Sequence, residues 1–76
     1  MNTARRKKIA EAENLLAQAR EILQDALEGE QEAFDNMPPS LQDGDRGERM
    51  QEAISALEDA SASIEEIESA LQEARA

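Results

Sequence analysis

Residues 9–26 read IAEAENLLAQAREILQDA, and the spacing of their apolar residues decides the fold. Two series with a seven-residue period run through this stretch. The larger side chains are Ile9, Leu16 and Leu23, and the smaller ones are Ala12, Ala19 and Ala26. Alternating steps of three and four residues bring both series to one side of an α-helix. The stretch therefore predicts an amphipathic helix that packs against another helix.

This first helix is predicted to cover residues 3–36. Thr3 is its expected N-cap, because a hydroxyl oxygen can accept a hydrogen bond from one of the first free N–H groups. Pro38 and Pro39 end the helix, since proline has no N–H to donate and disfavours helical backbone in the residue before it. Residues 37–45 are predicted to form a loop.

A second helix is predicted over residues 46–75, so that the chain forms a single domain, residues 1–76. Asp45, with Glu48 three residues later, matches the pattern of a capping box. The heptad pattern then returns in two series. They are Met50, Leu57, Ile64 and Leu71, and Ala53, Ala60, Ile67 and Ala74.

The composition favours an all-α protein. Ala, Glu, Lys, Leu and Arg account for 42 of the 76 residues, a share typical of coiled coils and long helices. There is no Val, Tyr or Trp and only one Thr, so a sheet would lack the residues that pack its faces. The absence of Cys and His excludes thiolate nucleophiles, histidine bases and zinc–thiolate sites. We therefore expect no enzymatic activity, no catalytic residue, no cofactor and no metal site.

No apolar run approaches the ~20 residues of a membrane-spanning helix. The basic start is followed by Glu11 and Glu13, which interrupt the apolar run that a signal peptide would need. We expect a soluble, cytoplasmic protein.

The two helices are expected to form an antiparallel hairpin with an alanine-rich seam. A large side chain opposite each alanine fills the space between the helices. This is achieved when the numbers of facing residues sum to 83, which sets Leu23 opposite Ala60 and Ala12 opposite Leu71.

Further apolar side chains flank the predicted seam and widen the apolar surface to that of a helical bundle. These residues are Leu15, Ile22, Leu27, Phe34 and Ile54. A chain this short often gains stability by association, so the favoured architecture is a homodimeric four-helix bundle with these five residues at the dimer interface. The alternative is a monomeric hairpin in which Phe34, Met37 and Leu41 pack beneath the loop.

The formal net charge of −10 gathers into two acidic stripes. The first helix carries Glu21, Asp25, Glu28, Glu32 and Asp35, and the second carries Glu52, Asp59, Glu66 and Glu73, with Glu58 and Glu65 beside them. Like charges one helical turn apart repel each other by roughly 0.2–0.5 kcal/mol per pair. Two interpretations remain: a solvated face without a partner, or an anionic surface that binds a basic protein groove in competition with nucleic acid.

Two other charged features have simpler interpretations. The RRKK sequence at residues 5–8 is expected to pair with acids near the C-terminus or on a partner subunit. Direct binding to nucleic acid is disfavoured, because only four charges are present and no aromatic residue lies among them. Glu30 lies among apolar residues, and we expect it to reach Arg46, Arg49 or a second subunit, since a buried unpaired carboxylate is costly.

The region around the loop has a distinctive sequence. Residues 30–38 read EQEAFDNMP, followed by SLQ at 40–42, RGE at 46–48 and EAI at 52–54. This pattern resembles a group of small acidic helical proteins encoded by bacteriophages and prophages. Pro39 departs from the pattern and is expected to stiffen the turn. The resemblance implies a helical hairpin in a bacterial host cell and no active-site residues.

The resemblance also implies a class of function. Phages encode many short proteins without enzymatic chemistry that bind and block host machinery, anti-CRISPR proteins among them. The sequence therefore predicts a non-enzymatic, acidic protein-binding module that inhibits a basic, nucleic-acid-binding host protein. The alternative is a passive oligomerisation or scaffold protein, and a DNA-binding protein that uses its basic start ranks third.

Overall fold

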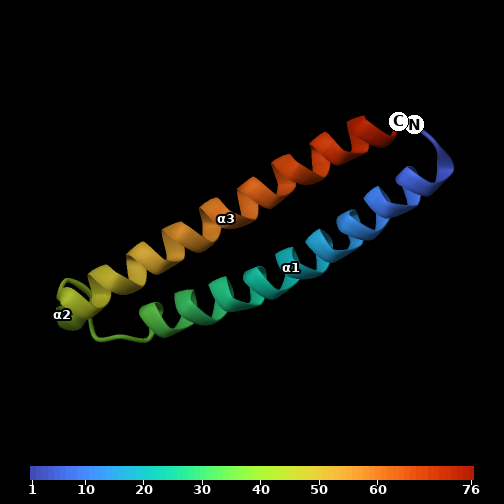
Figure 1. Ribbon diagram of the computed structural model, residues 1–76. Helices are drawn as coiled ribbons and strands as arrows, with labels where there is room; N and C mark the ends of the chain where they lie inside the picture. The colour runs from blue at the N-terminus through green and yellow to red at the C-terminus, as the bar shows by residue number, and fades with distance from the viewer.

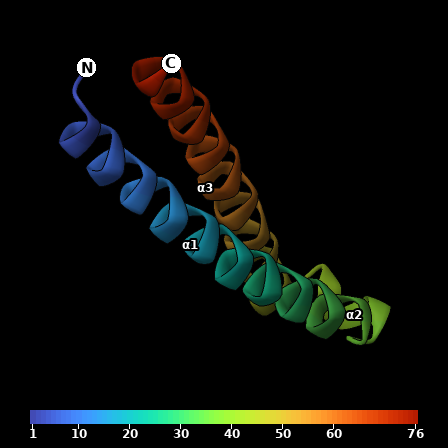
Figure 2. The same cartoon turned by 90° about the vertical axis from the view of Figure 1, so that its right-hand side faces the viewer.

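The computed structural model describes residues 1–76 and contains three helices. The long helices α1 (Thr3–Asp35) and α3 (Asp45–Arg75) run antiparallel, and the short helix α2 (Pro39–Gln42) lies in the connection between them (Figure 1). The long helices cross at a shallow angle, and both termini lie at the same end of the molecule (Figure 2). The molecule measures 58 × 15 × 13 Å. The all-helical class and the long helices predicted from the sequence are confirmed.

The N-cap of helix α1 lies one residue earlier than predicted. Asn2, not Thr3, is the N-cap, and its Oδ1 accepts a hydrogen bond of 2.9 Å from the N–H of Arg5. Thr3 is the first helical residue. Asn is at least as good a cap as Thr, because its short side chain reaches the same free N–H groups.

The connection is more ordered than the predicted loop. Pro39 opens α2, where its fixed φ suits the first turn of a helix and its missing N–H leaves no donor unsatisfied. Gln42, at the end of α2, turns back to α1. Its Nε2 donates to the carbonyl oxygens of Phe34 at 3.0 Å and Met37 at 3.2 Å. The glutamine side chain thus adds hydrogen bonds to carbonyls where α1 ends, and the Phe34 carbonyl also accepts one from the N–H of Met37 at 3.1 Å.

Helix α3 starts without the predicted capping box. The N-cap is Gly44, which has no side chain, and Asp45 is the first helical residue. Asp45 and Glu48 both lie in the first turn, where negative charge is favourable near the positive end of the helix dipole. The expected role of Asp45 as a cap is therefore wrong by one residue, although its charge still supports the start of the helix.

The residues between the helices define the hairpin seam. Along α1 the half-buried positions are Ile9, Ala12, Glu13, Leu16, Ala17, Ala19, Arg20, Leu23, Leu27, Glu30 and Phe34, continued by Met37 after the helix. Along α3 the buried or half-buried positions are Gly47, Met50, Ala53, Ile54, Leu57, Ala60, Ser61, Ile64, Glu68 and Leu71. Steps of three and four residues recur in both sets, which keeps one side of each helix against the other.

The predicted alanine seam is found in part. Ala12, Ala19, Ala53 and Ala60 are half-buried, whereas Ala26, Ala33 and Ala74 are exposed and Ile67 is 48% exposed. Three larger side chains, each one residue after a predicted alanine position, are also buried or half-buried: Leu27, Phe34 and Ile54. Removal of their apolar surface from water stabilises the hairpin by about 25 cal/mol per Å². The predicted dimer interface, which included these three residues, stays a prediction.

Two ion pairs join α1 to α3 along the seam. Arg20 donates through Nε to Glu68 Oε1 at 2.8 Å and through Nη2 to Glu68 Oε2 at 3.3 Å. Arg75 Nε donates to Glu13 Oε1 at 2.6 Å. Side chains tilt toward the N-terminus of their own helix, so in an antiparallel pair Arg20 and Glu68 lean toward each other.

The ion pairs indicate the direction in which the two helices pair. The cross-helix ion pairs join Arg20 to Glu68 and Glu13 to Arg75, and the residue numbers of each pair sum to 88. Both pairs are those of an antiparallel hairpin, and the predicted register, in which the numbers of facing residues sum to 83, stays a prediction.

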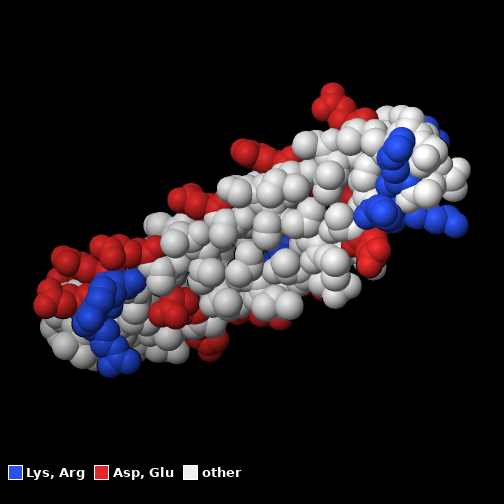
Figure 3. Space-filling view, viewed as in Figure 1, with Lys and Arg blue, Asp and Glu red and all other residues white.

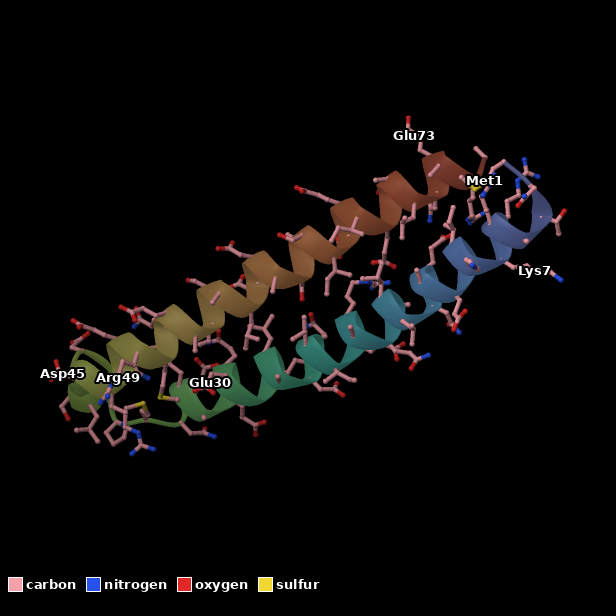
Figure 4. The ribbon with its side chains drawn as sticks, in the orientation of Figure 1. Met1, Lys7, Glu30, Asp45, Arg49 and Glu73 are labelled. Atoms are coloured by element: carbon pink, nitrogen blue, oxygen red, sulfur yellow. The ribbon has the colours of Figure 1, made fainter.

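Some seam positions remain polar. Glu30 is half-buried and forms no ion pair with Arg46 or Arg49, so the pairing with a second subunit stays a prediction. Figure 4 shows Arg49 nearer the loop than Glu30. The Ser61 Oγ is buried without a hydrogen-bond partner. The seam of the single hairpin thus contains two polar side chains, Glu30 and Ser61, that have no ion-pair or hydrogen-bond partner across it.

Gly47→Ala is predicted to destabilise the protein by about 1–3 kcal/mol. A Cβ at this position would lie 2.0 Å from the backbone oxygen of Gln42, so α2 would have to move. The matched control is Gly29→Ala, whose Cβ would meet nothing within 4 Å and which should stabilise α1 by about 0.5–1 kcal/mol. Urea unfolding measures both. Equal effects of the two substitutions would contradict close packing of α2 on α3.

Ser61→Ala is predicted to stabilise the protein by about 1 kcal/mol more than Ser55→Ala. Both changes remove a hydroxyl from α3 and gain the same helix propensity. Only the Ser61 hydroxyl is buried without a partner, whereas Ser55 is exposed. Thermal unfolding followed by circular dichroism compares the two variants, and a Ser61→Ala protein no more stable than Ser55→Ala would argue against a desolvated hydroxyl.

Arg20→Glu is predicted to lower the melting temperature, because it places a carboxylate against Glu68 and near Glu21 and Glu65. Adding Glu68→Arg should restore much of the loss by reversing the ion pair. The double variant distinguishes pairing across the hairpin from a general effect of charge. A double variant that melts no higher than Arg20→Glu alone would overturn the pairing.

Candidate functional site

The acidic stripe of α1 lies on the surface as predicted. Glu21, Asp25, Glu28, Glu32 and Asp35 are all exposed, and none takes part in an ion pair. Their 4-3-4-3 spacing keeps them on one side of α1, beside the seam. The stripe is therefore a continuous run of carboxylates without an ion pair, although Glu21 lies within the field of Arg20.

Three carboxylates of this stripe meet one from α3. Glu28, Glu32 and Asp35 line a surface hollow together with Glu58. Leu27 lies in the same hollow, beside Gln24, Gln31 and Asn36. We call this hollow the acidic groove. The juxtaposition could not be read from the spacing on either helix alone, because it depends on which side of α3 turns toward α1.

Two glutamines hold carboxylates of the acidic groove in place. Gln24 Nε2 donates to Glu28 Oε1 at 3.3 Å, and Gln31 Nε2 donates to Asp35 Oδ1 at 2.9 Å. Both are one-turn contacts on the surface of α1. Each leaves the other carboxylate oxygen available to an external donor.

Acidic charge continues from the groove toward the middle of the hairpin. The hydrogen bonds that Arg20 donates to Glu68, followed by the charge of Glu68, raise the pKa of Arg20, and the charges of Glu65 and Glu21 raise it further. Arg20 thus lies within the field of carboxylates from both helices. The Arg20 guanidinium is the basic group of the seam at this level, and its hydrogen bonds are already directed to Glu68.

The acidic repeat of α3 forms a separate surface. Glu52, Asp59, Glu66 and Glu73 are exposed, and Figure 4 shows Glu73 pointing away from α1. The seven-residue spacing keeps the other three on the same outer side of α3. The structure therefore brings Glu58, but not this outer series, together with the acidic groove.

The remaining long side of the hairpin is uncharged. On α1 a second series with steps of three and four residues contains Ala12, Leu15, Ala19, Ile22, Ala26, Gly29 and Ala33. On α3 the matching series contains Ala53, Ala56, Ala60, Ser63, Ile67, Ala70 and Ala74. We call these two series the outer stripes. Figure 3 shows a broad uncharged band along one face, bordered by acidic side chains.

The residues predicted for the dimer interface are divided between two places. Leu15 is 59% exposed and Ile22 is 67% exposed, and both belong to the outer stripes. Ile54 is buried, while Leu27 and Phe34 are half-buried in the seam. Ile67, predicted as a core residue, joins Leu15 and Ile22 at the surface. Of the set expected beneath the loop, Phe34 and Met37 are half-buried, but Leu41 is exposed.

Basic side chains gather at both ends of the molecule (Figure 3). Residues 5–8 are exposed and form no ion pair, so the expected pairing with acids near the C-terminus is not observed. Arg6 and Lys7 line a shallow hollow with Arg75 at the open end. Arg46 and Arg49 are likewise exposed and unpaired at the loop end.

The arrangement of side chains suits binding better than chemistry. No group of three or more carboxylates is placed to hold a metal ion. The exposed carboxylates accept hydrogen bonds and attract cationic side chains, and the outer stripes offer apolar surface. No helix combines the length and apolar character needed to cross a membrane.

Comparison of the chain with protein families, with curated proteins and with solved structures gives no match in any of the three.

Proposed function

We propose that the protein is a non-enzymatic binding module that uses its acidic groove to occupy a basic surface of another protein. The observation that carries this proposal is the meeting of Glu28, Glu32 and Asp35 from α1 with Glu58 from α3, without a basic residue between them. Like charges held together on a folded surface repel one another. A basic partner would relieve this repulsion and gain charge-assisted hydrogen bonds.

The acidic groove suits a partner that ordinarily binds nucleic acid. Such a partner carries Lys and Arg along a groove that follows a phosphate backbone. The hairpin is long and narrow, at 58 × 15 × 13 Å, and presents carboxylates in series along α1. Its resemblance to acidic phage proteins favours an inhibitor of host defence or nucleic-acid processing, such as an anti-CRISPR protein, acting in the bacterial cytoplasm.

Self-association is part of this proposal. The seam contains one buried apolar residue, Ile54 at 8% exposure, so an isolated hairpin has almost no core. Two copies that shared their uncharged sides in a four-helix bundle would leave the acidic grooves free. The alternative function, a scaffold that only oligomerises, is favoured by the outer stripes, which would serve it without any use of the groove.

Reversal of charge in the groove is predicted to abolish binding to a basic partner. The groove variant carries Glu28→Lys and Glu32→Lys, and its matched control carries Asp59→Lys and Glu66→Lys on the outer side of α3. Both variants change the net charge by the same amount. Pulldown from bacterial lysate with mass spectrometry identifies the bound proteins, and circular dichroism verifies that each variant remains helical.

We expect the wild type and the control to recover nucleic-acid-binding proteins that the groove variant does not recover. Binding should weaken steeply with salt, because the Debye length falls from ~10 Å at 0.1 M to ~3 Å at 1 M. Added duplex DNA should compete. Equal loss in both variants would indicate general charge attraction, and recovery of the protein itself alone would favour the scaffold.

A further inference from the structure

The hairpin exposes more surface than a chain of its size needs to. Its accessible surface is 5630 Å² for 8.4 kDa, whereas a compact monomer of that mass exposes about 4,600 Å². Its radius of gyration is 17.2 Å, against about 11 Å for a compact domain of 76 residues. An excess of about 1,000 Å² per chain is close to what each partner buries in a standard interface.

The exposed large apolar side chains of the two long helices lie on one face. Leu15, Ile22 and Ile67 are 59%, 67% and 48% exposed, and all three belong to the outer stripes. Small residues fill nearly all the other positions of those stripes, so another pair of helices could approach closely. The 58 × 15 Å extent of the hairpin corresponds to about 870 Å², near the ~800 Å² that each partner of a standard interface contributes.

The cluster formed by Leu15, Ile22 and Ile67 lies near the middle of the molecule. The midpoint of α1 (Thr3–Asp35) falls between Leu15 and Ile22, and Ile67 directly precedes Glu68, whose carboxylate binds Arg20. A two-fold rotation that reverses the long axis would therefore bring the cluster of one copy onto that of another. The same rotation would keep the two hairpins in contact over most of their length.

The charge distribution selects this reversed arrangement. Residues 1–20 and 68–76, at the open end, carry six basic and four acidic side chains. Residues 21–67, which include the loop end, carry 14 acidic and two basic side chains. Copies aligned in the same direction would place the two strongly acidic parts together. Reversed copies place each basic end beside the loop half of its partner, where Arg46 and Arg49 also lie but the net charge is strongly negative.

We propose that the outer stripes bind a second copy of the chain in the reversed direction, forming a four-helix bundle. Leu15, Ile22 and Ile67 form its centre, and the basic residues 5–8 of each copy lie beside the acidic loop half of the other. This proposal rests on the self-association proposed above and adds its surface, direction and charge pairing. The acidic grooves stay outside the interface.

Sedimentation equilibrium tests whether the outer stripes form the dimer interface. The wild type should have about twice the chain mass at tens of micromolar. Ile22→Glu should raise the dissociation constant of the dimer at least tenfold, because a carboxylate would be buried in the apolar centre. Gln18→Glu is the control, since it adds the same charge at an exposed position of α1 outside the outer stripes and should leave the dimer unchanged.

Spin-label distances test the direction, and they do not depend on the stability of a variant in the apolar centre. The chain has no cysteine, so Lys7→Cys introduces a single labelling site at the exposed basic end. At 1.5 Å per residue, reversed copies should hold the two labels about 35–45 Å apart, whereas copies in the same direction would hold them within about 20 Å.

The outcomes separate the two proposals. A wild type that stays monomeric at hundreds of micromolar would overturn self-association together with this interface. A dimer that Ile22→Glu leaves intact would keep self-association and overturn this surface, and labels within about 20 Å would overturn the reversed direction. Binding of basic proteins is measured separately through the groove variant, so its failure would leave the dimer unaffected.

Discussion

An isolated pair of helices can bury only one stripe of each helix, and this limit governs the rest of the molecule. The hairpin brings Leu27, Phe34 and Ile54 into its seam, yet only Ile54 becomes buried among the apolar residues. Every other large side chain remains partly in contact with water. The gain from burial is therefore small, and the molecule depends on close fits at the ends of the helices and on polar contacts along the seam.

The connection shows one such close fit. Gln42 supplies two hydrogen bonds to the end of α1, and α3 approaches it so closely that only glycine fits at position 47. The loop end is thereby fastened by backbone contacts and one amide side chain. The middle and open end are joined instead by the ion pairs of Arg20 and Arg75, which are partly exposed and contribute less than their number suggests.

Much of this fold was predictable because helical periodicity and proline leave strong local signals. The hairpin, its helix lengths and the exposure of the acidic stripes follow from the spacing of Leu16, Leu23 and the carboxylates. Which face of each helix turns toward the other helix was not predictable in the same way. Leu16 and Leu23 can share a seam with Ala12 and Ala19 or with Arg20 and Leu27, since both sets differ from them by steps of three and four. The acidic groove depends on this choice, and Gln42 and Gly47 act through contacts that carry no local sequence signal.

The residues found in the seam give the alanine repeats a second meaning. In the predicted packing they fill the hairpin, and the larger flanking residues remain for a partner. In the structure Leu27, Phe34 and Ile54 move inside, and most of the alanines line an uncharged side with Leu15, Ile22 and Ile67. A seven-residue repeat free of charge is difficult to explain as a solvated surface in a chain where 34% of residues are charged. Each long helix thus carries one apolar stripe in the seam of its own hairpin and a second stripe at the surface, and the carboxylates occupy the surface between them. Because the outer stripes and the acidic groove share no residue, association through the outer stripes, as proposed, would leave the groove exposed.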